Sequence, residues 1–341
     1  MVRGFRFAKG LTQFMTIADL WILLPLLALT AGALLVLLLG AVVPGRYGTA
    51  VGVVACLAAA LWTLLTPPLA VAPNLGLSFT PFARFFTGLF TLTGAATLLL
   101  SHDYTARRGI TGEEYPATVL FAAFGMATVA ASVNFLTLFL GLEALTFAFY
   151  FLVACDRNRG ASAEAGLKYL LLGAVSAALL AFGIALFYAA TGSLEIVALH
   201  GSAGNPLVLA GWGLVLAGLA FKVSLVPAHL WTPDVYQGAP LPVTAFLATG
   251  SKGASFVALL ISLEGGGPAP VRPLLGGLAL FSMVVGNLAA LRQENLKRLL
   301  AYSSIAQMGY VALALLVGTP RGYSAVAFYL VEIGVLFRIG S

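Results

Sequence analysis

Residues 221–256 read FKVSLVPAHLWTPDVYQGAPLPVTAFLATGSKGASF, and they place two lysines, one histidine and four prolines inside sequence that is otherwise strongly apolar. A lysine at the centre of a transmembrane helix costs about 2.5 to 3.5 kcal/mol on insertion scales. We therefore expect Lys222 and Lys252 to serve ion chemistry, and we expect the function to reside in this stretch.

The composition of the whole chain predicts a membrane protein built from helices. Hydrophobic residues make up 60% of the 341 residues and charged residues only 9%, whereas about a quarter of the residues of soluble proteins are charged. The apolar runs are long, rich in Leu and Ala, and lack the alternation of a membrane barrel. At roughly 20 residues per span, the sequence predicts an all-α, polytopic membrane bundle of about eleven transmembrane helices, at roughly 18–43, 49–66, 83–101, 116–132, 134–154, 163–191, 207–227, 240–262, 272–291, 299–317 and 322–338.

The seventh apolar segment, residues 207–227, is predicted to be a broken helix. Pro227 removes a backbone donor and clashes with the preceding turn, and Pro233 and Gly238 follow before Pro240 opens the next helix. Interrupted backbone at membrane depth is tolerated only where protein covers it or where it lines a water-filled cavity, and broken helices of transporters lie at ion or substrate sites. An ordinary turn between two helices is the alternative interpretation.

Four ionisable side chains inside the apolar segments are candidates for ion chemistry. Glu143 and Lys252 are central in their segments, Lys222 lies just before the predicted break, and Lys168 lies one to two turns into its helix. Burial destabilises an ammonium group and a nearby carboxylate stabilises it, so we expect a buried polar row that carries protons. The alternative is a static ion pair between Glu143 and one lysine, although this pair leaves two lysines without a carboxylate.

Two residues of the predicted break, His229 and Asp234, flank Trp231 and have two interpretations. Either they link the lysine row to one aqueous surface, or they cap and hydrogen-bond the broken helix. Glu164 precedes Lys168 by four residues, which is the favourable order for an ion pair near a helix start. We therefore interpret Glu164 as structural.

The sequence contains no motif for a metal site, a redox centre or a hydrolase. Cys56 and Cys155 are far apart, whereas an iron–sulfur cluster needs four thiolates. We interpret Ser303 and Ser304 as packing residues of a membrane helix. The net charge of +6 is scattered through loops and not interleaved with aromatic residues, which argues against nucleic acid. No HExxH motif includes any of the three histidines, His102, His200 and His229.

The basic residues of the loops predict that the N-terminus lies outside the membrane, although three basic residues near that terminus favour the opposite orientation. With the N-terminus outside, the inside positions hold Arg46, Arg107, Arg108, Arg157, Arg159, Arg292, Lys297, Arg298 and Arg338.

The motif HLWTPDVYQGAP at residues 229–240, with FKVSLVP before it and PVTAFLATGSK after it, resembles the subunit N family of proton-pumping NADH-quinone oxidoreductases, or complex I. Further similarity lies in FLGLEAL around Glu143, in AGLKYLLLGAVSAALLAFGIALFYAATGSL and in NLAALRQENLKRLLAYSSIAQMGY. The resemblance extends over roughly residues 80–330. The related subunits L and M and the cation/proton antiporter subunits carry a WLPDA form of the motif instead.

The resemblance implies an antiporter-like membrane-arm subunit that translocates protons while NADH oxidation and quinone reduction occur in other subunits. By matching position, Glu143 corresponds to the glutamate of the fifth helix, Lys168 to the lysine of the sixth, Lys222 to that of the broken seventh and Lys252 to that of the eighth. Asp234 is the aspartate of the motif. In such subunits the seventh-helix lysine gathers a proton and passes it along the central axis, and the glutamate modulates it by charge.

The same resemblance implies where the cofactors and partners lie. NADH, FMN, iron–sulfur clusters and quinone are expected in partner subunits, and no cofactor or metal is expected in this chain. The expected partners are other membrane-arm subunits, including antiporter-like ones, and the lipid bilayer of a bacterial inner membrane. Two alternatives are a cation/proton antiporter subunit without redox coupling and a truncated chain that packs but does not pump.

Two departures from the family pattern affect these expectations. SSIAQMGY stands where many relatives have SSISHLGY, so Gln307 replaces a histidine that can carry a proton, although glutamine can still order water. Relatives have about fourteen helices, built as two inverted repeats, whereas this chain stops near the eleventh, so we expect a fragment or an incomplete second repeat. The expected divisions are N-terminal helices in residues 1–110, a first repeat in 111–265 and a partial second repeat in 266–341.

Overall fold

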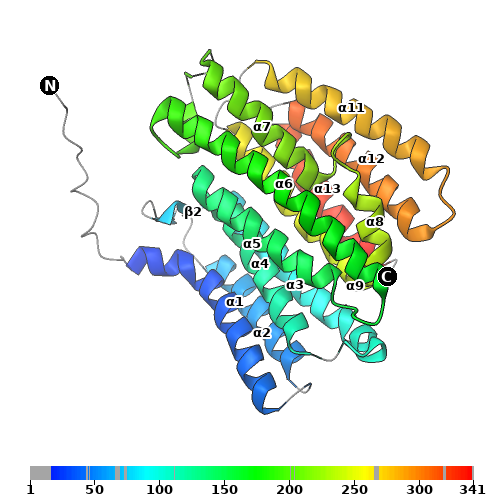
Figure 1. Ribbon diagram of the computed structural model, residues 1–341. Helices are drawn as coiled ribbons and strands as arrows, with labels where there is room; N and C mark the ends of the chain where they lie inside the picture. The colour runs from blue at the N-terminus through cyan, green and yellow to red at the C-terminus, as the bar shows by residue number, and fades with distance from the viewer. Residues whose placement is uncertain are drawn as a thin grey trace.

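A computed structural model describes residues 17–339 except 44, 46, 66–69, 73, 74, 111, 200, 203, 265–268, 318 and 319. The described residues are mostly helical (Figure 1). In chain order the α-helices are α1 (Ile17–Val42), α2 (Gly48–Leu65), α3 (Pro81–Arg108), α4 (Glu114–Ala131), α5 (Phe135–Val153), α6 (Gly160–Thr191), α7 (Pro206–Val223), α8 (Trp231–Gly238), α9 (Leu241–Phe246), α10 (Lys252–Glu264), α11 (Val271–Ala290), α12 (Leu296–Leu316) and α13 (Pro320–Ile339). A 3₁₀ turn, η2 (Ile196–Leu199), precedes α7, and a π-helical turn, η3 (Leu247–Ser251), joins α9 to α10.

The predicted all-α membrane bundle is confirmed. Each apolar segment predicted from the sequence falls on a helix of the structure. Among the described residues, 10 helical spans are long and apolar enough to cross a membrane, and α9, η3 and α10 together form one of them. Helix α13 occupies the position of the last predicted segment.

One short hairpin interrupts the helical architecture, and the sequence did not predict it. Strands β1 (Ala70–Ala72) and β2 (Leu77–Phe79) pair antiparallel between α2 and α3. Gly76 has a φ of 63°, which glycine adopts without strain, and its carbonyl accepts a hydrogen bond from the Val133 N–H at 2.9 Å. The strands are too short for an alternating pattern to reveal them, and the hairpin ties the α2–α3 connection to the start of α5.

Polar residues determine where several helices begin. The side-chain oxygens of Thr80, Asn134 and Asn295 accept hydrogen bonds from first-turn backbone N–H groups of α3, α5 and α12, at 3.1, 2.8 and 3.2 Å respectively. These caps satisfy backbone donors that a helix start leaves without a partner. Helices α3, α5 and α12 therefore begin at polar residues that the sequence supplies.

Small residues allow α4 and α5 to approach each other closely. A Cβ atom added at Gly125 would lie 2.5 Å from the Leu145 nitrogen, and one added at Gly141 would lie 2.9 Å from the Val129 nitrogen. Both distances are shorter than van der Waals contact, so only glycine fits at this crossing. Membrane helices commonly associate through such small residues because lipid provides no hydrophobic force between them.

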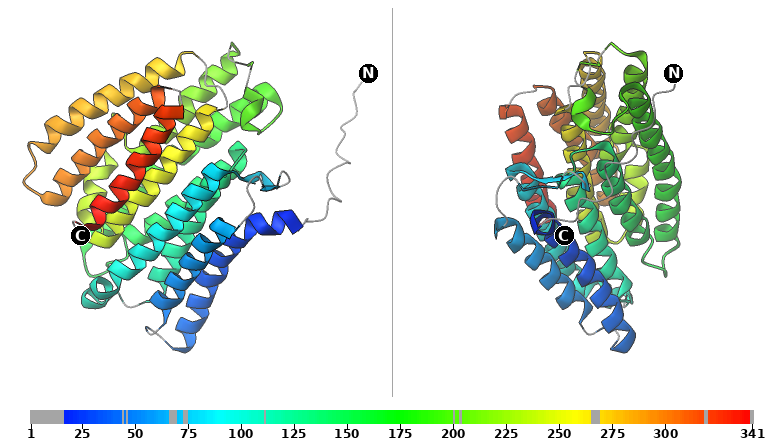
Figure 2. Two further views of the ribbon diagram at one scale, coloured as in Figure 1. Left: turned by 180° about the vertical axis from the view of Figure 1, so that it is seen from behind. Right: turned by 90° about the vertical axis from the view of Figure 1, so that its left-hand side faces the viewer.

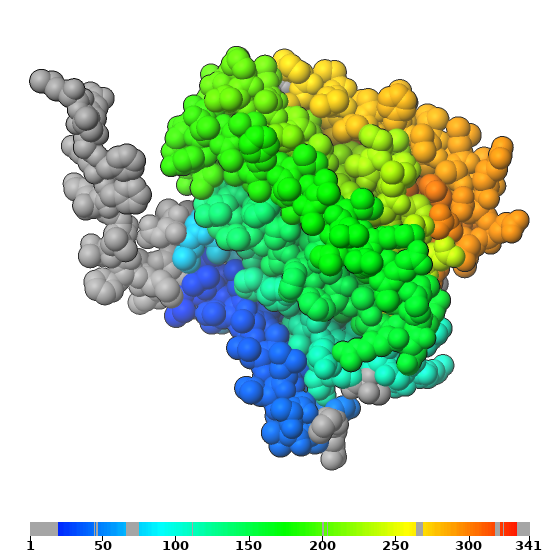
Figure 3. All heavy atoms as spheres, in the orientation of Figure 1, coloured from blue at the N-terminus to red at the C-terminus, as the bar shows by residue number. Residues whose placement is uncertain are grey.

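The span formed by α9, η3 and α10 is the most deeply buried of the candidate membrane spans. Seen from behind, α10 (yellow) lies beside α13 (red) in Figure 2. Helix α6, by contrast, exposes most of its side chains and covers part of the front face in Figure 3 (green). The segment that carries Lys252 is therefore enclosed by protein.

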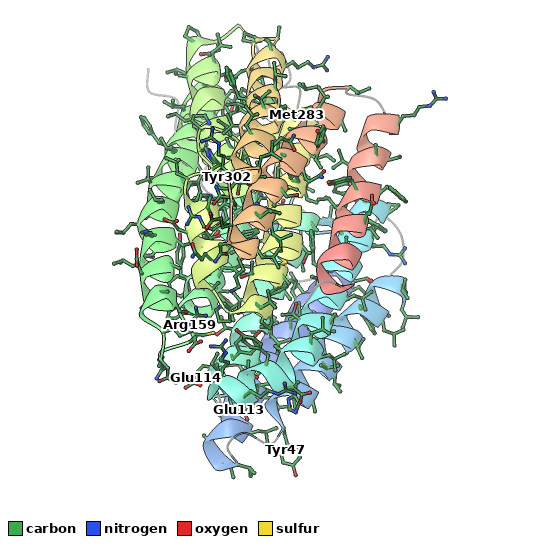
Figure 4. All side chains as sticks on the ribbon, turned by 90° about the vertical axis from the view of Figure 1, so that its right-hand side faces the viewer. Tyr47, Glu113, Glu114, Arg159, Met283 and Tyr302 are labelled. Carbon is green, nitrogen blue, oxygen red and sulfur yellow. The ribbon has the colours of Figure 1, made fainter. Side chains whose placement is uncertain are left out.

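Loops that connect alternate helices lie at the same end of the bundle. Tyr47, Glu113, Glu114 and Arg159 are found together at that end in Figure 4, and the Glu113 carboxylate accepts a hydrogen bond from the Gly45 N–H at 2.9 Å. This arrangement follows from helices that cross successively in opposite directions. The side of the membrane that this end faces stays a prediction.

We expect Gly125→Ala to destabilise the bundle by about 1 to 3 kcal/mol, because the added methyl group overpacks the α4–α5 crossing. Thermal unfolding of the purified protein in detergent measures the change. Gly213→Ala in α7 is the matched control, since a Cβ atom there meets nothing within 4 Å. Equal stability of the two variants would contradict the proposed close packing.

Candidate functional site

The predicted break lies between α7 and α8. Helix α7 ends at Val223, Ser224 takes the left-handed conformation with a φ of 67°, and helical geometry resumes only at Trp231. The Val226–Pro227 peptide bond within this interval is cis. The chain thus leaves the helix just after Lys222, as the prolines predicted.

Neighbouring side chains satisfy the polar groups of the break. The Val226 N–H donates to Ser282 Oγ of α11 at 2.8 Å. The Trp231 indole N–H donates to the Phe221 carbonyl at 2.8 Å. Because these partners come from the protein, the interruption is compatible with a low-dielectric environment.

Lys222 forms the most deeply buried ion pair among the described residues. Its Nζ atom lies 3.0 Å from Glu143 Oε1 of α5 and donates to Thr146 Oγ1, one turn further along α5, at 2.7 Å. The Lys222 side chain is 3% exposed and the Glu143 side chain 28% exposed. The Thr146 hydroxyl donates its own hydrogen to the Leu142 carbonyl. Both polar partners of Lys222 therefore act as acceptors.

Lys252 is fully buried in a different environment. Among the described residues its Nζ atom has no carboxylate partner, and it donates to Ser304 Oγ of α12 at 2.8 Å. It also lies 4.9 Å from the centre of the Tyr236 ring and 5.8 Å from that of Trp231. These are cation–π distances, so aromatic faces and one hydroxyl surround the amine.

Trp231 contacts the end of α7 and the Lys252 amine. Its N–H group binds the carbonyl of the residue before Lys222, and its ring faces Lys252. Tyr169 of α6 stacks on the same ring, with 4.7 Å between ring centres. The motif tryptophan therefore contacts both the end of α7 and the Lys252 amine, and packing against Tyr169 holds it in place.

Asp234 joins three helices in an ion network. Its two carboxylate oxygens lie 2.9 Å from Lys168 Nζ of α6 and 2.7 Å from Arg298 Nη1 of α12. Lys168 also pairs with Glu164 at 2.8 Å, as the spacing predicted, and Arg298 donates to Gln237 Oε1 at 2.9 Å. This network anchors α8 to α6 and α12.

The structure corrects the expected position of Lys168. The sequence predicted a buried amine in one row with Lys222 and Lys252, but the Lys168 side chain is 44% exposed and pairs with two carboxylates. The physical reason is that α6 lies at the surface, where Lys168 reaches the outer face of α8. Two lysines remain in the buried region, and only one of them, Lys252, lacks a carboxylate.

His229 and Asp234 do not cap the broken helix with their side chains. Leu230 occupies the position before α8, which has no side-chain cap, and the Asp234 carboxylate serves the ion network. His229 is buried, and its Nδ1 atom has no hydrogen-bond partner in the described part of the structure. A role for either residue in connecting the lysines to an aqueous surface stays a prediction.

The sequence did not predict the site roles of four residues: Thr146, Tyr236, Arg298 and Ser304. Thr146 lies three residues after Glu143 and so on the same face of α5, a spacing that carries a usable signal. Ser304 was interpreted as packing, and Arg298 was counted only as a loop cation. Their partners are distant in sequence, so only the folded chain reveals these roles.

The remaining residues considered in the sequence are Gln307, the two cysteines and the histidines. Gln307, at the position of the family histidine, accepts a hydrogen bond from the Tyr329 hydroxyl of α13. Across the described residues no group of three His, Cys, Asp or Glu side chains is arranged to hold a metal ion. Cys56 and Cys155 are free thiols. His200 lies outside the described residues.

The sequence of this chain is similar to those of known membrane proteins. Residues 132–337 match the family described as NADH:quinone oxidoreductase/Mrp antiporter, transmembrane. The "NADH-quinone oxidoreductase subunit N" of Geotalea uraniireducens is 67% identical over 323 residues, which cover 93% of this chain and 69% of that protein.

Two solved structures share the fold. A chain of respiratory complex I from Thermus thermophilus superposes with a TM-score of 0.79 at 39% identity, covering 92% of this chain and 69% of that one. A chain of the Mrp complex from Dietzia sp. superposes with a TM-score of 0.82 at 25% identity, covering 93% of this chain and 36% of that one.

We expect Ser282→Ala to destabilise the protein by about 1 to 2 kcal/mol, because it removes the acceptor of the Val226 N–H at the break. Ser262→Ala is the matched control, since Ser262 is equally buried but, among the described residues, its hydroxyl bonds only to the Ala258 carbonyl of its own helix. Thermal unfolding in detergent compares the two variants. If both unfold at the same temperature, Ser282 does not support the break.

Proposed function

The chain belongs to the NADH:quinone oxidoreductase/Mrp antiporter family of membrane proteins, and we propose from this that it is a membrane-arm subunit of a proton-translocating NADH-quinone oxidoreductase. The identity to relatives named as subunit N supports this assignment. Within it the chain carries no redox chemistry and acts as a translocase. NADH, FMN, iron–sulfur clusters and quinone are assigned to partner subunits.

The observation that carries the proposal is the buried ion pair of Lys222 and Glu143 beside the interrupted helix. At 3.0 Å the carboxylate stabilises the ammonium form of Lys222 in an environment that otherwise disfavours any charge. If α5 or the end of α7 moves, the pair separates and the uncompensated ammonium group releases its proton. The break supplies backbone that is able to move without disrupting a continuous helix.

A static ion pair accounts for these contacts less completely. It explains Glu143 and Lys222, but it gives no reason for a second buried lysine without a carboxylate. Removing Lys252 would relieve a desolvation cost if the amine had only a packing role. We therefore assign proton translocation to Glu143, Lys222 and Lys252. We assign a different role to Lys168 and Asp234, which couple this buried region to the ion network on the outer face of α8.

The alternative function, a cation/proton antiporter subunit without redox coupling, has less support. It rests on the shared fold with the Mrp complex at 25% identity, against 67% identity to a subunit N and 39% to a complex I chain. Other membrane-arm subunits are the proposed partners. A bacterial inner membrane is the proposed location, because Geotalea and Thermus relatives are bacterial proteins.

The division into repeats is part of the same proposal. Residues 111–265 hold α4 to α10, including the interrupted helix, and form the proposed first repeat. Residues 1–110 supply the preceding helices, and residues 266–341 supply helices of a second repeat. The Lys222 and Lys252 sites then lie within the first repeat, while from the second Ser304 reaches Lys252 and Arg298 reaches Asp234.

We expect Lys222→Ala to lower NADH-driven proton uptake by at least about tenfold, since it removes the group that exchanges the proton. Inverted membrane vesicles with a pH-sensitive dye measure uptake, and quinone reduction in the same vesicles falls with it. Assembly, followed by native gel electrophoresis, stays largely intact.

Arg292→Ala is the control for loss of one cation, because Arg292 is exposed in the loop before α12. This variant is expected to pump at the original rate. Normal pumping by an assembled Lys222→Ala complex would refute the role of Lys222 in translocation.

We expect Lys252→Ala to reduce proton uptake less than Lys222→Ala, because the neighbouring amine takes over part of its charge. The same vesicle assay ranks the two variants at matched levels of assembled complex. A deeper loss for Lys252→Ala would reverse the order of importance proposed for the two lysines.

A further inference from the structure

The polar contact of Lys252 is part of a buried chain of hydroxyl groups. Ser304 Oγ lies 2.8 Å from Lys252 Nζ and 3.3 Å from the Tyr236 hydroxyl. Lys252, Tyr236 and Ser304 are all buried. Tyr236 comes from α8 and Ser304 from α12, so the chain joins three elements of the bundle.

The Ser304 hydroxyl differs from the threonine hydroxyl beside Lys222. Thr146 donates its hydrogen to the Leu142 carbonyl, and it therefore only accepts from an amine. Within the described residues Ser304 has no carbonyl partner, and its contacts are Lys252 and Tyr236. A serine hydroxyl carries one donor and two acceptor sites, and here both kinds are available.

We propose that Ser304 and Tyr236 form a reversible hydroxyl pair that accommodates Lys252 both as an ammonium ion and as a neutral amine. The inference rests on the proposed function, in which Lys252 changes its charge. Ser304 and Tyr236 are positioning residues in this scheme. They stabilise the two states of the proton carrier in turn.

The two states differ in the direction of the hydrogen bonds. An ammonium group only donates, so Lys252 donates to Ser304 Oγ and the Ser304 O–H points to the Tyr236 oxygen. A neutral amine has a lone pair, so Ser304 rotates and donates to Lys252 while the Tyr236 O–H donates to Ser304. The reversal breaks no covalent bond to hydrogen and is independent of the route by which a proton reaches Nζ.

Burial makes this reversal necessary. Lys252 is shielded from bulk solvent, and a buried polar group without a partner carries a desolvation penalty. A partner that only accepts, as at Thr146, supports one charge state. The aromatic faces of Trp231 and Tyr236 favour the ammonium form but give the neutral lone pair no donor.

The test compares single and double variants in the assembled complex, with proton uptake measured in inverted vesicles. We expect Ser304→Ala to lower uptake by about tenfold, since it removes a hydrogen bond to a charged group. Ser304→Thr keeps the hydroxyl and retains most of the uptake. Tyr236→Phe keeps the ring but loses the hydroxyl, and we expect it to lower proton uptake when Ser304 is present. The double variant with Ser304→Ala and Tyr236→Phe is expected to show the same uptake as Ser304→Ala alone.

Ser303→Ala is the matched control, because this neighbouring serine has no hydrogen bond to the amine, and it pumps at the original rate. Wild-type uptake by assembled Ser304→Ala or Tyr236→Phe complexes would overturn the hydroxyl pair, as would equal losses for Ser304→Thr and Ser304→Ala. Should Ser304→Ala fail to assemble, Tyr236→Phe alone decides the outcome. Lys222→Ala is assayed in parallel to separate the two proposals. Normal pumping by Lys222→Ala defeats the proposed function. If Lys222→Ala loses pumping while Ser304→Ala pumps normally, only the hydroxyl pair is defeated.

Discussion

A polar group at membrane depth must find its partner within the protein, because the hydrocarbon region offers no water. The interval between α7 and α8 depends on this constraint. It frees backbone groups from the helix, and Ser282 of α11 and the Trp231 side chain return a partner to two of them. Pro227 and the left-handed Ser224 interrupt the helix, and without these contacts the Val226 N–H would lose the acceptor that Ser282 provides. The break and the surrounding helices are therefore one structural unit.

The same constraint is met differently at the two buried lysines. Lys222 relies on a carboxylate at 3.0 Å and a hydroxyl that only accepts, so its environment is matched to positive charge. Lys252 relies on aromatic faces and on Ser304, whose hydroxyl is free to donate or to accept. An ion pair is sensitive to small separations, since Coulomb energy is large where the dielectric constant is low. The two sites thus supply an amine controlled by a charge and an amine controlled by hydroxyl groups.

Helix α8 connects these sites to the outer part of the bundle. Its eight residues carry Trp231 and Tyr236 on the lysine side and Asp234 toward Lys168 and Arg298. Helix α12 contributes both Arg298 and Ser304, so the same two helices meet at the exposed ion network and at the buried amine. Both contacts therefore depend on how α8 packs against α12.

The sequence by itself determined the membrane-spanning helices, the interruption after Lys222 and the identity of the buried charges, because each depends on local properties: length, hydropathy, proline and the cost of charge in lipid. It misplaced Lys168 and assigned Ser304 to packing, since neither burial nor a partner 52 residues away follows from local pattern. Only the tertiary structure decided that Glu143 pairs with Lys222 while Lys252 meets a serine and two aromatic rings. The physical reason is that helix packing determines which helix faces meet, and close crossings at glycines such as Gly125 help to set this packing. A hydrogen bond or ion pair forms only at the short distances that this packing produces.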